Sequence, residues 1–224
     1  MNPRPAAVAR HPHLAEPLAE GLVRVDLHSH TMWSGDSTTT PEEVEEAVLD
    51  CGIDVLCITD HNATKGAEEL AGRLACQVIV GVEVKSRSGE IIGLFLEERI
   101  PFGLPAPDVC RRIRDQGGIV YVPHPFDPLR NCLREDVLLE LIEADLEHLN
   151  RRAHDVAREA GLAMGGGSDA HVPDALGAAY SEMPAFDGTP AGFLASLREG
   201  TVIGHHYDAP RRWRPRIVPS TSVS

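Results

Sequence analysis

The sequence predicts an α/β fold in one domain, with a polar site at the carboxyl ends of its strands. Short apolar runs alternate with amphipathic stretches, which is typical of βα units around a parallel sheet. Clusters of histidine and aspartate follow several of these runs directly. The chain has 224 residues, 42% of them hydrophobic, which is enough to build one sizeable core.

Five strands are expected, each leading into polar side chains. Their ranges are 22–27, 54–58, 77–82, 119–122 and 163–164. Barrels and open α/β sheets place their active sites at the carboxyl ends of such strands. The polar residues are therefore expected to meet at one rim.

The first expected helix has clear signals at both ends. Thr40 is followed by Pro41 and, three residues on, by Glu43, which is a capping box with proline at the first helical position. The helix should run to Cys51, with Gly52 ending it. Further helices are expected over 63–75, 107–116, 134–160 and 189–198.

The folded domain is expected to span 22–204, with a mobile arm before it and a mobile tail after it. Residues 1–21 mix Pro, His, Arg and Glu, so His11 and His13 are expected to be solvated. The tail, 205–224, is rich in Pro and Arg. No window approaches the roughly 18 apolar residues of a membrane span, and the start lacks a signal core. No membrane association is expected.

Charge and cysteine content narrow the class of protein. A formal net charge of −13 argues against binding long nucleic acids, whose affinity comes from Lys and Arg at phosphates. Aromatic residues are 4% of the chain, too few for a stacking series along a single strand. Five cysteines without CxxC spacing indicate reduced thiols in a cytoplasmic protein. The oligomeric state is not predicted.

Nine residues are candidate metal ligands, because imidazole and carboxylate together suit Zn, Mn or Fe. His28 and His30 alternate by two, so on a strand both point to the same face. Asp169 and His171 repeat this spacing after three glycines. The other candidates are Asp36, His61, Glu83, Glu90 and His124.

Some of these candidates have ordinary structural alternatives. Asp36 lies in a Ser-Gly-Asp loop, where aspartate is a common turn residue, and Glu90 would also suit the surface of a hairpin. Glu83 ends an apolar strand, and its two oxygens could bridge two cations about 3.5 to 4 Å apart. His124 lies between two prolines that restrict its backbone.

Four ordered motifs resemble the PHP family, the polymerase and histidinol phosphatase group of metal-dependent phosphoesterases. They are Asp-Leu-His-Ser-His-Thr at 26–31 with Asp36, Thr-Asp-His-Asn at 59–62, His-Pro at 124–125, and Ser-Asp-Ala-His at 168–171. The resemblance covers about 23–204 and is closer to the subgroup acting on small phosphates. It implies a distorted (β/α)7 barrel that binds two to three divalent ions, with a bridging hydroxide as nucleophile.

The resemblance also implies how the ligands divide among the ions. The first ion would take His28, His30, Glu83 and Asp169. The second would take Glu83, Glu90 and His124, and the third Asp36, His61 and His171. Many family members carry histidine where this chain has Glu90, although a glutamate suits an oxygen-preferring ion such as Mn.

The expected function is hydrolysis of a small phosphate monoester, such as a nucleotide or a sugar phosphate. The ions would lower the pKa of a shared water toward about 7 and neutralise the phosphoryl oxygens. Arg130 is expected to clamp the phosphate, with a surface loop arginine as the alternative. Asp60 would protonate the leaving alcohol or support a ligand. An oligonucleotide exonuclease or phosphodiesterase, and a non-catalytic metal-stabilised binding protein, are the alternatives.

Overall fold

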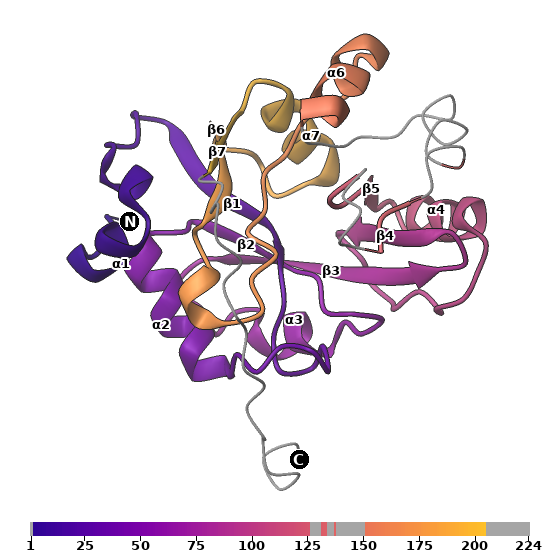
Figure 1. Cartoon of the computed structure of the whole chain (residues 1–224), viewed down its shortest axis with the longest axis horizontal. Helices are drawn as coiled ribbons and strands as arrows, with labels where there is room; N and C mark the ends of the chain where they lie inside the picture. Colours follow the sequence, from indigo (N-terminus) through magenta and orange to yellow (C-terminus); the bar gives the residue numbers. More distant parts are fainter. Residues whose placement is uncertain (1, 126–130, 134–136, 138–150, 205–224) are drawn as a thin grey trace, which may run out of the picture.

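The computed structural model describes residues 2–125, 131–133, 137 and 151–204, and for 151–154 the backbone alone (Figure 1). The described strands form one curled sheet of seven, in the order β5-β4-β3-β2-β1-β6-β7. Their bounds are β1 Leu22–Ser29, β2 Val55–Ile58, β3 Gln77–Ser86, β4 Gly89–Leu94, β5 Ile119–Tyr121, β6 Ala179–Pro184 and β7 Thr201–Gly204. This confirms the α/β class and the distorted barrel type.

The sheet is mixed, which corrects the expectation of a parallel one. Among the described strands, β1–β2 and β2–β3 pair in parallel, whereas β3–β4, β4–β5, β1–β6 and β6–β7 pair in antiparallel. The expected strand at 163–164 is not formed. Instead, Leu27 donates to the Gly166 carbonyl at 3.2 Å, and Ser29 makes an isolated parallel bridge with Ala170.

The mixed pairing still brings the polar residues to one rim. β1, β2 and β3 end at this rim. β4 runs in the opposite direction, so its first residues lie beside the end of β3, with Glu90 opposite Lys85. β5 is antiparallel to β4 and therefore ends at the rim again, just before His124.

Most of the described helices pack against the sheet, and they in part confirm the expected bounds. Their bounds are α1 Pro5–Arg10, α2 Pro41–Cys51, α3 Lys65–Leu70, α4 Ala106–Asp115, α6 Arg151–Ala160 and α7 Pro190–Arg198. α2 has the capping box and ends at Gly52 with φ 66°. α3 is shorter than expected, because Ala71 is extended and Gly72 has φ 76°. Most of 134–150 lies outside the described residues.

Three apolar clusters hold these layers together. α2 and α3 pack on β2 through residues such as Val48, Leu56 and Leu70. α7 packs on β1 and β3 through Phe193, and α4 packs on β3 to β5 through Ile113.

All five cysteines are free, and burial raises the pKa of the Cys51 thiol to about 12, as suits a small core residue. Within the described residues, no helix is long and apolar enough to cross a membrane.

The N-terminal segment is folded, contrary to the expected mobile arm. α1 and a 3-10 turn, Pro12–Ala15, bury Ala7 and Leu14 in the cluster that contains α2. His11 is fully buried, with Nε2 3.0 Å from the Asp174 carbonyl oxygen, and His13 Nε2 lies 2.9 Å from that of Gly177. The expectation that these histidines are solvated is wrong. The expected tail, 205–224, lies outside the described residues.

Candidate metal centre

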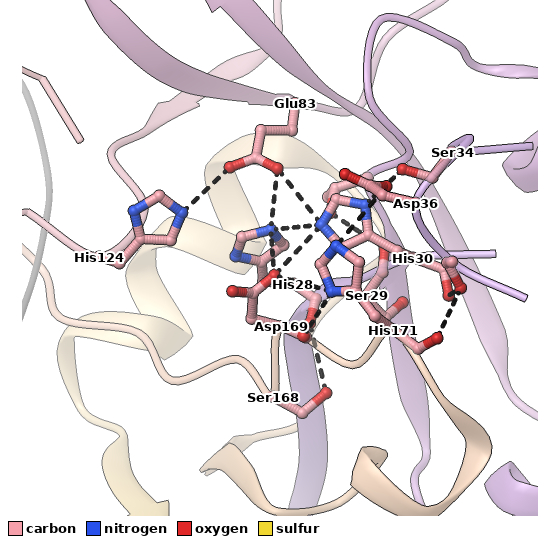
Figure 2. A network of polar contacts seen from close by, with 12 residues as sticks. His28, Ser29, His30, Ser34, Asp36, Glu83, His124, Ser168, Asp169 and His171 are labelled. Carbon is pink, nitrogen blue, oxygen red and sulfur yellow. Dashed lines mark hydrogen bonds and ion pairs between the residues drawn. The ribbon is translucent and has the colours of Figure 1, made fainter. Parts of the chain in front are cut away.

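All nine candidate ligands converge at the rim of the sheet. Figure 2 shows seven of them by label, with their polar atoms turned toward a common centre between β1, β3 and the loop before β6. Four overlapping groups of three or four side chains each place their ligand atoms within 4.8 Å of one another. The groups are His28–His30–Asp169, His28–Glu83–His124, His61–Glu83–Glu90 and His30–Asp36–His61–His171.

The two strand histidines and two carboxylates form the tightest part of the centre. Nε2 of His28 and Nε2 of His30 are 2.9 Å apart. The Glu83 Oε2 atom lies 3.3 and 3.2 Å from these two nitrogens, and Asp169 Oδ1 lies 3.4 and 3.3 Å from them. Each carboxylate oxygen thus lies within 3.4 Å of both imidazole nitrogens. Metal–ligand bonds of about 2.1 Å place neighbouring tetrahedral ligand atoms about 3.4 Å apart, so the spacing of each carboxylate from the two histidines suits ligands of a common ion.

Glu83 connects this part of the centre to the next. Its Oε1 atom lies 3.3 Å from His124 Nε2, on the side away from His28 and His30 (Figure 2). The Glu90 Oε2 atom is 3.8 Å from the same nitrogen, and Glu90 is buried, which argues against a hairpin surface acid. Because the two oxygens of Glu83 face different sets of ligands, its position suits a carboxylate that bridges two ions.

Asp36, His61 and His171 form the third part of the centre. Asp36 Oδ2 is 3.0 Å from His61 Nε2, and Asp36 Oδ1 is 3.6 Å from His171 Nε2. The ring of His171 stacks on His30 with centroids 4.1 Å apart. Asp36 therefore contacts two imidazoles. These contacts favour a metal ligand over a residue that serves only to form a turn.

The electrostatics show carboxylates and imidazoles compensating one another. Burial works against the charged form of His28, yet the carboxylates of Asp169 and Glu83 raise its pKa above the ordinary value. Burial likewise opposes ionisation of Glu83, but the imidazoles of His28, His124 and His30 beside it hold its pKa well below the usual range. For Glu90, burial and the Glu83 charge raise the pKa. Without a metal, protons must provide the compensating charge.

Unpartnered buried atoms show that the side chains fit a metal. The buried atoms without a hydrogen bond include Asp36 Oδ1, His61 Nδ1, Glu83 Oε1 and His124 Nδ1. Buried polar atoms in proteins usually have a partner, and unsatisfied ones point to a missing water or ion. The ligand set is nitrogen and oxygen only, which suits Zn, Mn or Fe. The residues therefore fit the divalent ions that the sequence predicts.

Positive backbone φ angles mark three loops of the centre. His124 has φ 29°, Asp169 has φ 49° and Asn62, next to His61, has φ 56°. Aspartate and asparagine tolerate this region, whereas for histidine it is uncommon. Such conformations cost of the order of 1–3 kcal/mol each and gather at functional sites. The loops that present His124 and Asp169 are therefore held in place by the structure around them.

Of the two predicted catalytic residues, the structure describes Asp60. Its Oδ1 accepts from the Thr31 amide and its Oδ2 from the Thr31 hydroxyl, both at 2.6 Å, and the residue is fully buried. Both oxygens are thus engaged in fixing the segment after β1, which favours the supporting role over proton donation. Arg130 lies outside the described residues, so its role stays a prediction.

Two supporting residues were missed at the sequence level. Ser34 Oγ is 2.8 Å from His30 Nδ1 and accepts from the His61 amide at 3.0 Å, so it orients two candidate ligands. Asp26 Oδ1 accepts from the amides of Ser168 at 2.9 Å and His28 at 3.2 Å. The signal for Asp26 was present, because it continues the alternation of His28 and His30 by two.

The chain is similar in sequence to several known proteins. The chain is 36% identical to an uncharacterised protein of Methanocaldococcus jannaschii over 51% of this chain and 75% of that protein. It is 33% identical to a second one over 70% of this chain and 69% of that protein. It is also 39% identical to a phosphoribosyl 1,2-cyclic phosphate 1,2-diphosphodiesterase of Eggerthella lenta, over 34% of this chain and 32% of that protein.

Solved structures share the fold at low sequence identity. A two-domain protein of Bacteroides vulgatus, described as containing a predicted PHP-like metal-dependent phosphoesterase, has a TM-score of 0.64 at 20% identity, covering 84% of this chain and 67% of that one. A lesion-specific endonuclease of Pyrococcus furiosus has a TM-score of 0.62 at 15% identity, covering 81% and 57%.

Family models decide the membership. The PHP domain model matches residues 26–154, and the PHP-associated model matches residues 147–202. The first match alone covers more than half of the chain and includes the candidate ligands from His28 to His124. The chain therefore belongs to the PHP family, as its four motifs predict.

Proposed function

We propose that this protein is a metal-dependent phosphoesterase that hydrolyses a small phosphate monoester. The observation that carries the proposal is the convergence of nine candidate ligands, among them Glu83, whose two oxygens face different ligand sets. Family membership supports hydrolysis of a phosphate ester as the reaction class. The strongly acidic chain favours a small substrate over a long nucleic acid.

The side chains of the centre have defined tasks in this reaction. Bound divalent ions would supply an activated water and would neutralise the phosphoryl oxygens as charge moves to the leaving group. Glu83 would hold two ions at a fixed separation, His28, His30 and Asp169 would complete one ligand set, and His124 and Glu90 another. Asp60 and Ser34 keep Thr31 and His30 in position. Arg130 remains the proposed phosphate contact.

A small phosphodiesterase is the second candidate. The relative from Eggerthella lenta is named for cleavage of a cyclic phosphate diester, and it shares 39% identity over 85 residues. A diester has one negative charge on phosphorus and a monoester has up to two, so the same metal centre accepts either. The groups that contact the substrate beyond phosphorus decide between the two reactions.

The decisive experiment pairs metal analysis with turnover. Full-length protein purified without chelator would be analysed by elemental mass spectrometry and assayed on p-nitrophenyl phosphate, bis-p-nitrophenyl phosphate and a panel of nucleotides and sugar phosphates. We expect two to three equivalents of Zn, Mn or Fe, with faster release from monoesters than from diesters. A preference for diesters would support the second candidate.

A matched pair of histidine variants provides the control. His124→Asn removes a candidate ligand, whereas His13→Asn changes a histidine outside the centre. We expect loss of metal and activity in the first and retention of both in the second, with folding checked by circular dichroism. Less than one equivalent of metal and no turnover after Mn or Zn is added back would refute catalysis. That result would favour a binding role.

A further inference from the structure

Lys85 is an exposed cation beside an acidic centre. It is one of two lysines in a chain of net charge −13. It lies on β3 two residues after Glu83, so both side chains point to the same side of the strand. Lys85 also pairs in register with Glu90 on β4. The strand geometry therefore turns this lysine toward the candidate ligands.

The backbone of Lys85 is fixed on both sides. Its amide donates to Asn62 Oδ1 at 3.0 Å, and its carbonyl accepts from the Gly103 amide at 2.8 Å. Asn62 in turn donates its own amide to the Glu83 carbonyl at 2.9 Å. The loop that carries His61 thus holds β3 at two points. The Cα of Lys85 has a set position relative to the centre, while its side chain keeps rotational freedom.

The ammonium group of Lys85 lies close to the centre but makes only a loose contact with it. Lys85 Nζ is 3.9 Å from Glu90 Oε1, and the side chain is 45% exposed. A hydrogen bond from nitrogen to oxygen spans about 2.7–3.2 Å, so this contact is a loose ion pair. The donors of the ammonium group therefore remain available to an anion that enters from solvent.

We propose that Lys85 binds a second negatively charged group of the substrate, several bonds from the phosphoryl group that reacts. The proposal rests on the proposed function. Two residues along a strand span about 7 Å, so Lys85 extends beyond the position where Glu83 would hold its ions. The substrate class is then a small phosphate ester that carries a further carboxylate or phosphate. A lysine suits this task because its flexible stem adapts to anions of different shape.

The test uses two phosphonates that are not hydrolysed. Butylphosphonate and 4-phosphonobutyrate share the phosphonate and a short chain, but the second also carries a carboxylate. Binding of each to the full-length protein with Mn²⁺ present would be measured by calorimetry. We expect 4-phosphonobutyrate to bind about tenfold more tightly, as one charge-assisted contact provides.

Substitutions assign that difference to Lys85. Lys85→Met should remove the preference for 4-phosphonobutyrate and leave affinity for butylphosphonate and Mn content unchanged. Lys85→Arg should keep part of the preference, and Lys65→Met, the matched control, should keep all of it. Equal binding of the two ligands to the wild-type protein would overturn the proposal, as would a preference that survives Lys85→Met or a loss of metal in that variant.

The design separates this proposal from the proposed function. If the wild-type protein binds the phosphonates equally and releases phosphate from monoesters, the role of Lys85 is wrong and the phosphoesterase stands. If it binds neither ligand and releases no phosphate, the phosphoesterase is refuted, and the role of Lys85 with it.

Discussion

The β1 strand carries two buried polar groups of opposite character, one near each end. Near its start, Arg24 is 1% exposed. Its side chain donates to the Glu16 carbonyl at 2.8 Å and to Glu182 Oε1 at 3.4 Å. Its guanidinium also lies over the Tyr180 ring, 5.5 Å from the centroid. Near the end of the strand, the Nε2 atoms of His28 and His30 face each other at 2.9 Å.

The difference shows how to tell a structural polar cluster from a functional one. Around Arg24 the protein supplies a cation together with a carboxylate and a carbonyl that accept from it, so its charge is compensated without a bound ion. Around His28 and His30 it supplies acceptors in excess, including a Glu83 oxygen without a hydrogen bond. A buried cluster of this kind requires protons or metal ions to compensate its charge.

The largest expected effect comes from removing the bridging carboxylate. Glu83→Gln should lower phosphoesterase activity roughly a thousandfold and reduce the bound metal, because one neutral oxygen replaces two charged ones. Glu182→Gln, at the partner of Arg24, is the matched control and should keep its metal content and turnover. Elemental analysis and initial rates measure both. Full activity in Glu83→Gln would contradict the bridging role.

The Arg24 cluster should respond in stability alone. Arg24→Met leaves Glu182 and the Glu16 carbonyl without their donor, and removing one partner of a buried pair costs about 3 kcal/mol. The free energy of unfolding in urea measures this loss, with metal content unchanged. Arg73→Met, at an exposed ion pair with Glu42, serves as the control and should change stability little. Metal loss in Arg24→Met would show that the two ends of β1 are coupled.

The sequence revealed the metal end of β1 better than the arginine end, for a physical reason. The alternation of His28 and His30 is local, so the strand period alone predicts that both face one way. Asp169 could also be predicted, because it repeats the same spacing with His171 after three glycines. In the structure a Cβ at Gly167 would lie 2.5 Å from the His28 amide nitrogen, so this glycine allows the segment that carries Asp169 to approach β1 closely.

Contacts between residues far apart in the sequence could not be predicted in the same way. β6 pairs with β1 in antiparallel, so Arg24 meets Glu182 across 158 residues of sequence. The burial of His11 depends on a carbonyl 163 residues away, and no periodicity in a Pro-rich segment predicts it. Ser34 was missed because its two contacts arise from the fold of a loop, for which its sequence carries no pattern.

Asp26 lies between the two ends of β1 and sharpens the comparison, because it acts on the metal end from a buried position. Its Oδ1 accepts from the amide of the candidate ligand His28 and from the amide of Ser168, which precedes the candidate ligand Asp169. Asp26→Ala should weaken metal affinity by about 10- to 100-fold, as loss of an outer partner does. Asp26→Asn keeps one acceptor oxygen and should retain more of the affinity. Chelator competition measures both, and unchanged affinity in Asp26→Ala would contradict the positioning role.

The smallest expected effect is a pH dependence of stability that differs between the metal-free and the metal-bound protein. In the metal-free protein, burial opposes protonation of His28 and His30, but Glu83 and Asp169 raise their pKa values above the ordinary 6.5. The stability that these pairs contribute is fully present below pH about 6.5 and is lost as the pH rises through the raised values. Metal binding needs neutral imidazoles, so the stabilisation by metal should grow over the same range.

Thermal unfolding at pH 6, 7 and 8, with chelator or with Mn²⁺, measures both trends. The midpoint of the metal-free protein should fall with rising pH, and the gap between the two curves should widen. His28→Asn should flatten the metal-free curve, because asparagine does not titrate, whereas His13→Asn should not. A metal-free midpoint that rises from pH 6 to 8 would mean that protons do not compensate the charge of Glu83 and Asp169. The contrast between the two ends of β1 would then need another cause.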